Sequence, residues 1–216
     1  MTVTQILDPR AIRSREALLN AATVLLHQHH AASITATDVV REAQVSRPTL
    51  YQHFGDLTSL FIAATEARLR TLFTATLQPV DDDYEAGRAS IIELLEQLRA
   101  ESEFFFHATR GSSGFAVLQA LALVLAERLE SHSPVRAILD LEDTPPHLAE
   151  FLAHGTVGLV ARWLDSDFTG ENSVEAMTAQ IVSLLAFQLD SAVPQGAQGA
   201  PTPSSTTAVT NPKKVA

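Results

Sequence analysis

The amino-acid sequence predicts an all-helical protein, with a small N-terminal unit followed by a larger C-terminal part. Prolines divide the chain into long segments whose apolar residues recur with the period of an amphipathic helix. No run of the sequence alternates between apolar and polar residues in the way of a half-buried strand between hairpin turns. Hydrophobic residues make up 46% of the 216 residues, which is enough to bury a sizeable core.

Capping residues and apolar periodicity predict three helices before residue 55. Asp8 is a typical N-cap, and Pro9 fits the first position of the helix that follows. Ser46 is a second cap, and Pro48 is tolerated just after it because amides of the first turn have no partner within the helix. The expected helices cover residues 9–30, 35–43 and 47–53.

The remainder of the chain contains five further predicted helices. Asp56 opens the first, and a run of three acids opens the second, where negative charge suits a helix N-terminus. The segment after Gly114 is apolar on nearly all sides, so we expect a buried helix there. Asn172, with Glu175 three residues later, is expected to cap the last helix. The five helices are expected over residues 57–77, 81–98, 115–129, 147–165 and 173–190.

Charge and composition exclude several classes of protein. The net charge is −10, yet the first sixty residues contain five arginines and five acids, so the acidic surplus lies entirely after them. A polyanion can therefore approach only the N-terminal segment without strong net repulsion. The absence of cysteine excludes a disulfide scaffold and a cysteine nucleophile. No apolar run reaches the roughly 18 to 20 residues that span a bilayer, and no secretion signal is recognised, so we expect a cytoplasmic protein.

Residues 34–54 have the spacing of a helix-turn-helix. Val39 and Ala43 can pack on Val45 and Leu50, which fixes two short helices at a steep angle. The second helix then fits the major groove of B-DNA, which is about 12 Å wide. Arginine can pair with guanine and glutamine with adenine, while threonine can contact the methyl group of thymine and tyrosine and histidine commonly reach phosphates. The residues expected to project outward are Arg47, Thr49, Tyr51, Gln52 and His53.

The pattern Ala43-x-Val45-Ser46-x-x-Thr49-Leu50-Tyr51-x-His53-Phe54 resembles the TetR family of bacterial transcriptional regulators, and the resemblance extends through Leu60. It implies a helix-turn-helix DNA-binding domain over residues 9–56 and a ligand-binding and dimerisation domain over residues 57–191. Composition predicts a disordered tail over residues 192–216, since that segment is rich in proline and poor in large apolar residues. The expected DNA-binding residues are Thr35, Thr37, Ser46, Arg47, Pro48, Thr49, Tyr51, Gln52 and His53.

Four positions depart from the usual family pattern. Gln44 stands in the turn where glycine is usual, and Val40 stands where alanine is usual. Leu57 replaces a lysine that meets a phosphate, and Thr37 stands where many members carry a base-reading arginine. One lost phosphate contact lowers the salt slope of DNA binding by about 0.9 per half-site, and a left-handed residue other than glycine costs about 1 kcal/mol. A ligand- or partner-binding helical dimer with a degenerate helix-turn-helix is therefore an alternative reading.

The last two predicted helices carry more apolar surface than one chain readily buries. Gly155 and Gly158 lie inside a predicted helix, where each costs about 1 kcal/mol relative to alanine, so we expect another helix to approach them closely. The resemblance implies a homodimer whose four-helix bundle takes two helices from each subunit, and a single monomeric core is the alternative. The expected interface residues are Phe151, Gly155, Gly158, Arg162, Met177, Ile181, Leu184 and Leu185.

The resemblance also implies a small-molecule effector bound in the larger domain. Aromatic side chains and a single glutamine in an otherwise apolar helix indicate an apolar or aromatic molecule. The protein is then expected to be a repressor that leaves a pseudo-palindromic operator when the effector binds, although activation depends on where the operator lies. The expected ligand-binding residues are Phe104, Phe105, His107, Gln119, His154 and Trp163.

No apparatus for catalysis is visible, and we expect neither an enzyme nor a cofactor. His27, His29 and His30 lie at a predicted helix end and point in different directions, so no metal site is expected. The sequence has no Gly-x-Ser-x-Gly elbow, no HExxH pattern and no phosphate-binding glycine loop after a strand. A small-molecule enzyme using an acid with His107, such as Glu101 or Glu103, is a second alternative that the spacing does not favour.

Overall fold

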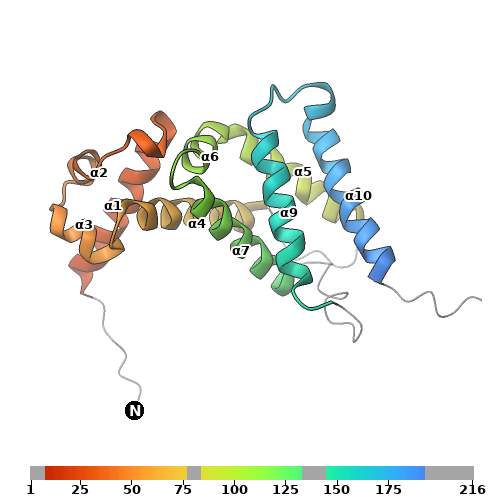
Figure 1. The fold of residues 1–216 in the computed structure, drawn as a ribbon, viewed down its shortest axis with the longest axis horizontal. Helices are drawn as coiled ribbons and strands as arrows, with labels where there is room; N and C mark the ends of the chain where they lie inside the picture. Colours follow the sequence, from red (N-terminus) through yellow and green to blue (C-terminus); the bar gives the residue numbers. More distant parts are fainter. Residues whose placement is uncertain (1–7, 77–83, 133–144, 193–216) are drawn as a thin grey trace, which may run out of the picture.

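The computed structural model of the chain describes residues 8–76, 84–132 and 145–192, and every regular element within these ranges is a helix, as predicted. In Figure 1, α1, α2 and α3 gather at one end of the molecule, α9 and α10 lie at the other, and α4 runs between them. The elements are α1 (Pro9–Gln28), η1 (Ala31–Ser33), α2 (Ala36–Ala43), α3 (Arg47–Phe54), α4 (Leu57–Thr76), α5 (Tyr84–Ala100), α6 (Ser102–Thr109), α7 (Gly114–His132), α9 (Leu148–Trp163), η2 (Gly170–Asn172) and α10 (Val174–Ala192).

Side-chain caps begin the first three helices. Asp8 and Ser46 are the caps that the sequence predicts, whereas Thr35, expected as the first residue of its helix, is the cap of α2. Asp8 accepts a hydrogen bond from a backbone amide of the first turn of α1, at 2.9 Å. Thr35 and Asp38 form a capping box at the start of α2, and Ser46 accepts from the amide of Thr49 at the start of α3. We call residues 9–54, which contain α1, η1, α2 and α3, the N-terminal unit.

Helix α4 connects the N-terminal unit to the larger part of the chain. Gly55 adopts a φ of +79°, which glycine tolerates, and so turns the chain between α3 and α4. The carboxylate of Asp56 then accepts a hydrogen bond from the amide of Ser59 at 2.7 Å and caps α4. With 20 residues, α4 is about 30 Å long, so it contacts α1 and α3 as well as α5 and α7.

The three consecutive phenylalanines lie in a helix of their own, which the sequence analysis did not predict. Glu101 ends α5 with a backbone conformation outside the helical region, and α6 begins directly after it. Phe104 and Phe105 are fully buried in α6 and meet edge to face at 5.1 Å between ring centroids. Phe106 is only partly buried, because three adjacent helical residues point in different directions.

The expected cap of the last helix, Asn172, is wrong. The hydroxyl of Ser173 accepts the hydrogen bond from the amide of Ala176, at 3.2 Å, so Ser173 caps α10. Asn172 instead ends the short helix η2, where its carbonyl accepts a hydrogen bond from the indole of Trp163 at 2.6 Å. A three-residue turn that the sequence analysis did not recognise therefore shifts the cap by one position.

One hydrophobic core runs from the N-terminal unit into the larger part, since Leu18, Leu60 and Val117 belong to the same cluster. The expectation that α7 is buried on all sides is wrong. Helices α4 and α9 pack against α7, but the side chains of Phe115 and Leu123 are 74% and 56% exposed in the single chain. The face of α7 that carries these two residues is left uncovered by the helices around it.

Candidate nucleic-acid interface

The packing between α2 and α3 holds α3 on the outside of the N-terminal unit. Val39 of α2 and Leu50 of α3 are fully buried, and Val45 between the helices packs against the same core. The turn is closed by Gln44, which adopts a left-handed conformation with φ 53° and ψ 38°. The sequence analysis expected a left-handed residue at this position. Its occupation by a residue other than glycine leaves backbone strain in the turn.

The outer face of α3 carries most of the residues that the sequence predicts at DNA. Tyr51 is 44% exposed, and Arg47, Pro48 and Gln52 are also exposed. Thr49 is half-buried, and its hydroxyl lies 2.7 Å from that of Ser46, so these two side chains are partly engaged with each other. The face therefore presents a guanidinium group, an amide and a phenol to the surroundings, and these are groups that read base edges and phosphates.

His53 has a partner inside the protein. Its Nε2 atom lies 2.8 Å from the hydroxyl of Ser14 in α1. Because Ser14 directs its own hydrogen to the carbonyl of Ala11, the hydroxyl oxygen is left to accept, and His53 donates from Nε2. This bond ties the last turn of α3 to α1, a role that the sequence analysis did not foresee because the two residues lie 39 positions apart.

The two threonines at the start of α2 differ in their surroundings. Thr35 is engaged in the capping box, where its hydroxyl donates to the carboxylate of Asp38 at 2.6 Å. The same hydroxyl, followed by the amide of Thr35 and the nearby Arg41, lowers the pKa of Asp38. Thr37 is exposed. Both threonines lie on the first turn of α2, so they can reach a phosphate only from the end of that helix.

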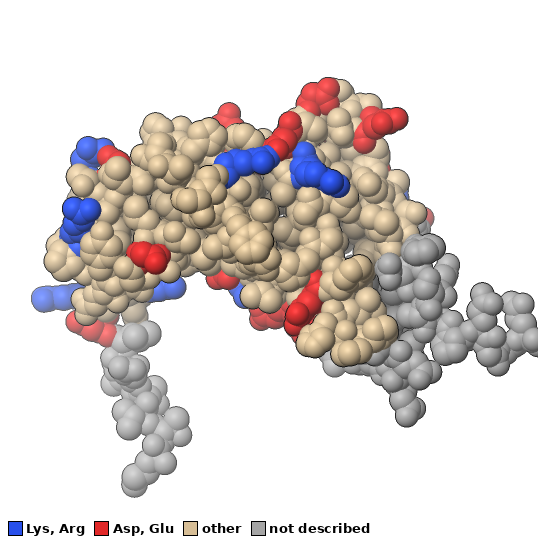
Figure 2. Space-filling view, in the orientation of Figure 1, with Lys and Arg blue, Asp and Glu red and all other residues tan. Residues whose placement is uncertain are grey.

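Cationic side chains project from the end of the molecule that contains α1, α2 and α3, as Figure 2 shows. Arg10, Arg13 and Arg47 are exposed there. Arg41 forms an ion pair with Asp38 at 2.9 Å, and Arg15 lies over the ring of Phe54, with its guanidinium carbon 5.3 Å from the ring centroid. Several cations at one end of an otherwise acidic chain favour contact with a polyanion at that end.

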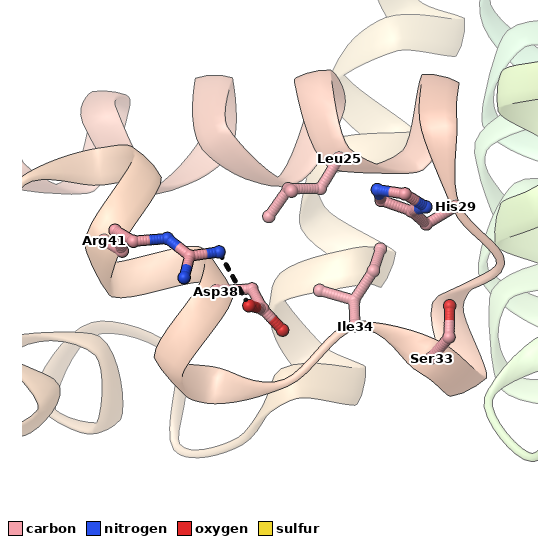
Figure 3. Close-up of a pocket in the computed structure, with 6 residues that line it drawn as sticks. All are labelled: Leu25, His29, Ser33, Ile34, Asp38 and Arg41. Atoms are coloured by element: carbon pink, nitrogen blue, oxygen red, sulfur yellow. Dashed lines mark hydrogen bonds and ion pairs between the residues drawn. The ribbon is translucent and has the colours of Figure 1, made fainter.

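A recess lies between the end of α1 and helix α2, and Figure 3 shows the ion pair of Asp38 and Arg41 at its edge. Its volume of about 230 Å³ is below the ~300 Å³ at which drug-sized ligand sites begin. The carboxylate is already bonded to Thr35 and Arg41, so the recess has no unpaired charge to attract a ligand. It is lined by Leu25, His29, Ser33, Ile34, Asp38 and Arg41.

The residues predicted at the dimer interface fall into two groups. Phe151 is 66% exposed and Leu184 is 47% exposed, while Met177 and Ile181 are buried in the core of the single chain. A Cβ atom added at Gly155 would meet nothing within 4 Å, and the same holds at Gly158, so packing within one chain does not explain either glycine. Arg162 is exposed and Leu185 is partly buried.

The residues predicted at the ligand lie in different surroundings. Phe104 and Phe105 contact each other in the core, and Gln119 contacts His154 at 2.8 Å between α7 and α9. His107 bonds to α1, and Trp163 bonds to Asn172.

The Gln119–His154 pair explains the single polar residue in the apolar helix α7. His154 donates from Nδ1 to the carbonyl of Glu150 at 2.8 Å, because a carbonyl can only accept. Its other ring nitrogen, Nε2, lies 2.8 Å from the side-chain oxygen Oε1 of Gln119. Each polar group therefore satisfies the other without a ligand.

The acids that a histidine-assisted enzyme would need are not assembled with His107. Glu101 is bonded to the guanidinium of Arg68 through two of its nitrogens, and this contact raises the pKa of Arg68. Glu103 is exposed to solvent. The described residues include no group of three or more histidine or acidic side chains arranged to hold a metal ion. No helix in the described ranges combines the length and apolar character needed to cross a membrane.

Residues 18–64, from the middle of α1 into α4, match the family described as "Bacterial regulatory proteins, tetR family". This stretch contains the whole α2–turn–α3 arrangement with the exposed face of α3. The matched segment therefore contains Arg41 and Arg47 together with the exposed Tyr51 and Gln52, while Arg10 and Arg13 precede it.

Solved structures share the fold over most of the chain. A TetR transcriptional regulator from Rhodococcus sp. RHA1 is 16% identical, with a TM-score of 0.57 over 81% of this chain and 96% of that one. A TetR-family regulator from Streptomyces coelicolor is 17% identical, with a TM-score of 0.53 over 84% and 93%. The TetR-family repressor AlkX from Dietzia sp., implicated in biodegradation of n-alkanes, is 16% identical, with a TM-score of 0.52 over 86% and 97%.

Proposed function

We propose that the chain is a DNA-binding transcription regulator of the TetR family, not an enzyme, and that it acts as a ligand-released repressor. The match of residues 18–64 to the family of bacterial regulatory proteins and the shared fold support this proposal. It binds a pseudo-palindromic operator as a homodimer in the cytoplasm and leaves that operator when a small molecule binds. The observation that carries this proposal is the exposed face of α3, with Arg47, Tyr51 and Gln52 held outward by the buried Leu50.

The residues at DNA have different roles in this proposal. Arg47 and Gln52 read base edges, since their side chains are exposed and can form paired hydrogen bonds with guanine and adenine. Thr49 contacts a thymine methyl group or a phosphate. Four residues contact phosphates of the DNA backbone: Thr35, Thr37, Tyr51 and His53. Ser46 and Pro48 determine where α3 begins. Ser46 caps the helix, and Pro48 fixes the backbone of its first turn.

The dimer supports this function because two copies of α3 must enter successive major grooves, about 34 to 36 Å apart. Exposed Phe151 and the two uncovered glycines of α9 favour a close helix contact with a second copy. Leu184 of α10 is a second exposed apolar residue, and Arg162 lies exposed on α9. Met177 and Ile181 then support the interface from within the core, and Leu185 lies at its edge.

An effector enters the larger part of the chain in this proposal. Its surroundings are apolar and aromatic, because α6 and α7 contribute phenylalanine, leucine and valine side chains there. The paired amide and imidazole of Gln119 and His154 are available as polar partners once the ligand separates them. Release of DNA requires that the effector bind one arrangement of the two α3 helices more tightly than the other, a coupling free energy of typically about 1–3 kcal/mol.

A fluorescence-anisotropy titration tests the proposal. Purified protein is titrated against DNA fragments upstream of its own gene and its neighbours, at two salt concentrations. We expect tight binding to one fragment, and Arg47→Ala to cost about 1–3 kcal/mol and to relax sequence preference. Arg99→Ala on α5, an exposed arginine far along the chain from the N-terminal unit, is the matched control and leaves binding unchanged. Tyr51→Phe weakens binding to all fragments alike, because a phosphate contact carries no sequence information.

The strained turn at Gln44 favours the second candidate, a ligand- or partner-binding dimer whose helix-turn-helix no longer binds DNA. Leu57 packs against the core and offers no cation to a phosphate at the start of α4. Weak binding that is equal across fragments, is abolished by salt and persists after selection from random DNA would establish this second candidate. Operator binding that depends on Arg47 would eliminate it.

A further inference from the structure

Helix α6 is bonded directly to the end of α1. The Nδ1 atom of His107 lies 2.8 Å from the carbonyl oxygen of Leu26, across 81 positions of the sequence. The last four carbonyls of a helix have no partner within that helix. The amide of His29 satisfies the carbonyl of Leu25 at 2.8 Å, and His107 satisfies that of Leu26. A residue of the larger part thus completes the C-terminal end of α1.

Aromatic contacts surround this bond. The rings of His30 and His107 meet edge to face at 4.4 Å between centroids, and His30 also lies 5.5 Å from the ring of Phe106. Three residues earlier in each segment, the rings of His27 in α1 and Phe104 in α6 are 5.2 Å apart. One pair of rings and one hydrogen bond therefore join α1 to α6, and two further ring pairs join α6 to His30, which lies between α1 and η1.

The turn after α6 also touches the N-terminal unit. Gly111 has a φ of +83°, and a Cβ atom added there would come within 3.0 Å of the side chain of Ala32 in η1. This distance leaves no room for a larger residue unless the backbone shifts. The α6–α7 turn and η1 therefore approach each other closely at this point.

Both ends of α6 are held by other helices of the larger part. At its N-terminus, Glu101 is bonded to Arg68 of α4. At its C-terminus, Arg110 forms an ion pair with Asp165, directly after α9, and its guanidinium carbon lies 5.1 Å from the ring centroid of Phe106. Helix α6 therefore contacts α4 and the end of α9 at its two ends, and α1 through its middle.

We propose that His107 is a positioning residue that holds the N-terminal unit to α6 and so transmits movements of α6 to the orientation of α3. The inference rests on the proposed function, since the orientation of α3 matters only where α3 enters DNA. An effector that shifts α6 relative to α4 and α9 strains the bond between His107 and Leu26. The N-terminal unit then follows α6 or loses the bond, and either result changes the separation of the two α3 helices.

The chemistry of the bond indicates the variants that test it. The Leu26 carbonyl only accepts, so His107 carries a proton on Nδ1. Asparagine places an amide NH₂ at the position of Nδ1 and keeps this donor, whereas leucine fills similar space and cannot donate. His107→Asn is therefore the conservative variant and His107→Leu the disruptive one. His29→Leu, the same change at the exposed histidine that directly follows α1, is the matched control.

The first measurement is the distance between two spin labels in the full-length protein. The chain has no cysteine, so Glu42→Cys in α2 and Gln97→Cys in α5, both exposed, introduce the only labelling sites. Labelled protein is diluted with unlabelled protein, and double electron–electron resonance reports the distance within one chain. We expect a narrow distribution for the wild type, His107→Asn and His29→Leu, and a broader or shifted one for His107→Leu. Operator affinity of His107→Leu falls about 5-fold or more, and His107→Asn restores it.

A second measurement needs no disruptive variant. Nitrogen-15 NMR at pH 8, well above the ~6.5 pKa of a free imidazole, distinguishes the two neutral tautomers. The His107 signal is assigned by its loss in His107→Asn. A proton on Nδ1 supports the proposal, and a proton on Nε2 overturns it even if His107→Leu does not fold.

Unchanged label distances in folded His107→Leu would also overturn the inference, as would a failure of His107→Asn to restore them. These results do not involve DNA. If the wild-type protein binds no operator, the proposed function is contradicted. The label distances and the His107 tautomer would still show whether α6 is bonded to α1.

Discussion

The imidazole Nε2 atom of His53 lies 2.8 Å from the hydroxyl of Ser14, so the last turn of α3 is bonded to the first helix. The sequence analysis places His53 at a phosphate. In the structure the imidazole of His53 instead bonds α3 to α1, and a phosphate can approach only the edge of the ring that stays exposed. The bond therefore links the stability of the N-terminal unit to the placement of the helix that is proposed to enter DNA.

Ser14→Ala should reduce the free energy of unfolding by about 1 kcal/mol, the usual net contribution of one hydrogen bond. His53→Ala and the double variant complete a double-mutant cycle, measured by urea denaturation. We expect a coupling energy of about 0.5–1.5 kcal/mol, because each single change removes the same bond. Strictly additive effects of the two substitutions would show that this bond does not contribute.

Gln44→Gly should stabilise the protein by about 0.5–1 kcal/mol. The backbone at this turn is left-handed, which costs about 1–2 kcal/mol for a residue with a Cβ atom, and the greater freedom of glycine in the unfolded chain offsets part of the gain. Thermal unfolding measures the change, with Gln44→Ala as the matched control that retains a Cβ atom. Equal stability of the glycine and alanine variants would contradict the strain assigned to this turn.

Asp56 should make the start of α4 sensitive to acid. Its pKa is lowered, chiefly by the hydrogen bond from the amide of Ser59, so the charged form is favoured in the folded protein. The resulting stability is present above the unfolded pKa of about 3.9 and is lost as the pH falls through the lower folded value. Urea denaturation of the wild type between pH 7 and pH 3 tests this loss.

Two substitutions at this position separate the charge from the cap. Asp56→Ala removes both and should cost about 1 kcal/mol at pH 7. Asp56→Asn keeps a capping side chain without the charge, so its stability should change less with pH than that of the wild type. A pH dependence that is the same in Asp56→Asn as in the wild type would assign the effect to other acids.

Gly155→Gln should convert the proposed dimer to a folded monomer. A Cβ atom at this position meets nothing within 4 Å in the single chain, so the longer side chain disturbs only a second copy. Analytical ultracentrifugation gives the oligomeric state, and circular dichroism checks that the helices are retained. Gly87→Gln is the matched control, since Gly87 lies in a helix and likewise has nothing within 4 Å of an added Cβ atom. A dimer that persists in Gly155→Gln would exclude this face of α9.

Local sequence signals predicted the N-terminal unit in detail. Asp8 and Ser46 cap the helices expected from them, because a capping bond joins residues only two or three positions apart. The same local reasoning failed in two places. The sequence analysis did not predict α6 as a separate helix, because nothing in the composition around Glu101 indicates that one helix ends there and another begins. It assigned the cap of α10 to Asn172, because it did not recognise the turn that η2 forms.

The site residues were harder to interpret than the helices. Gln119 was interpreted as a ligand-binding residue because it is the lone polar residue of an apolar helix, and His154 because its side chain could reach inward. The structure shows that they satisfy each other, which periodicity within either helix cannot reveal. The burial of α7 was overestimated for a related reason. A helix that is apolar on all sides must be covered, but the covering surface need not belong to the same chain, as the exposure of Phe115 illustrates.

By itself the sequence determined the all-helical fold class, the helix-turn-helix and the resemblance of its N-terminal segment to the TetR family. These depend on caps, apolar periods and a spaced motif, and all of them are encoded within about twenty consecutive residues. The tertiary structure alone decided that His53 meets Ser14 and that His107 meets Leu26, since these partners lie 39 and 81 positions apart. Such bonds depend on how whole helices pack, and no local pattern specifies which side chains that packing brings together.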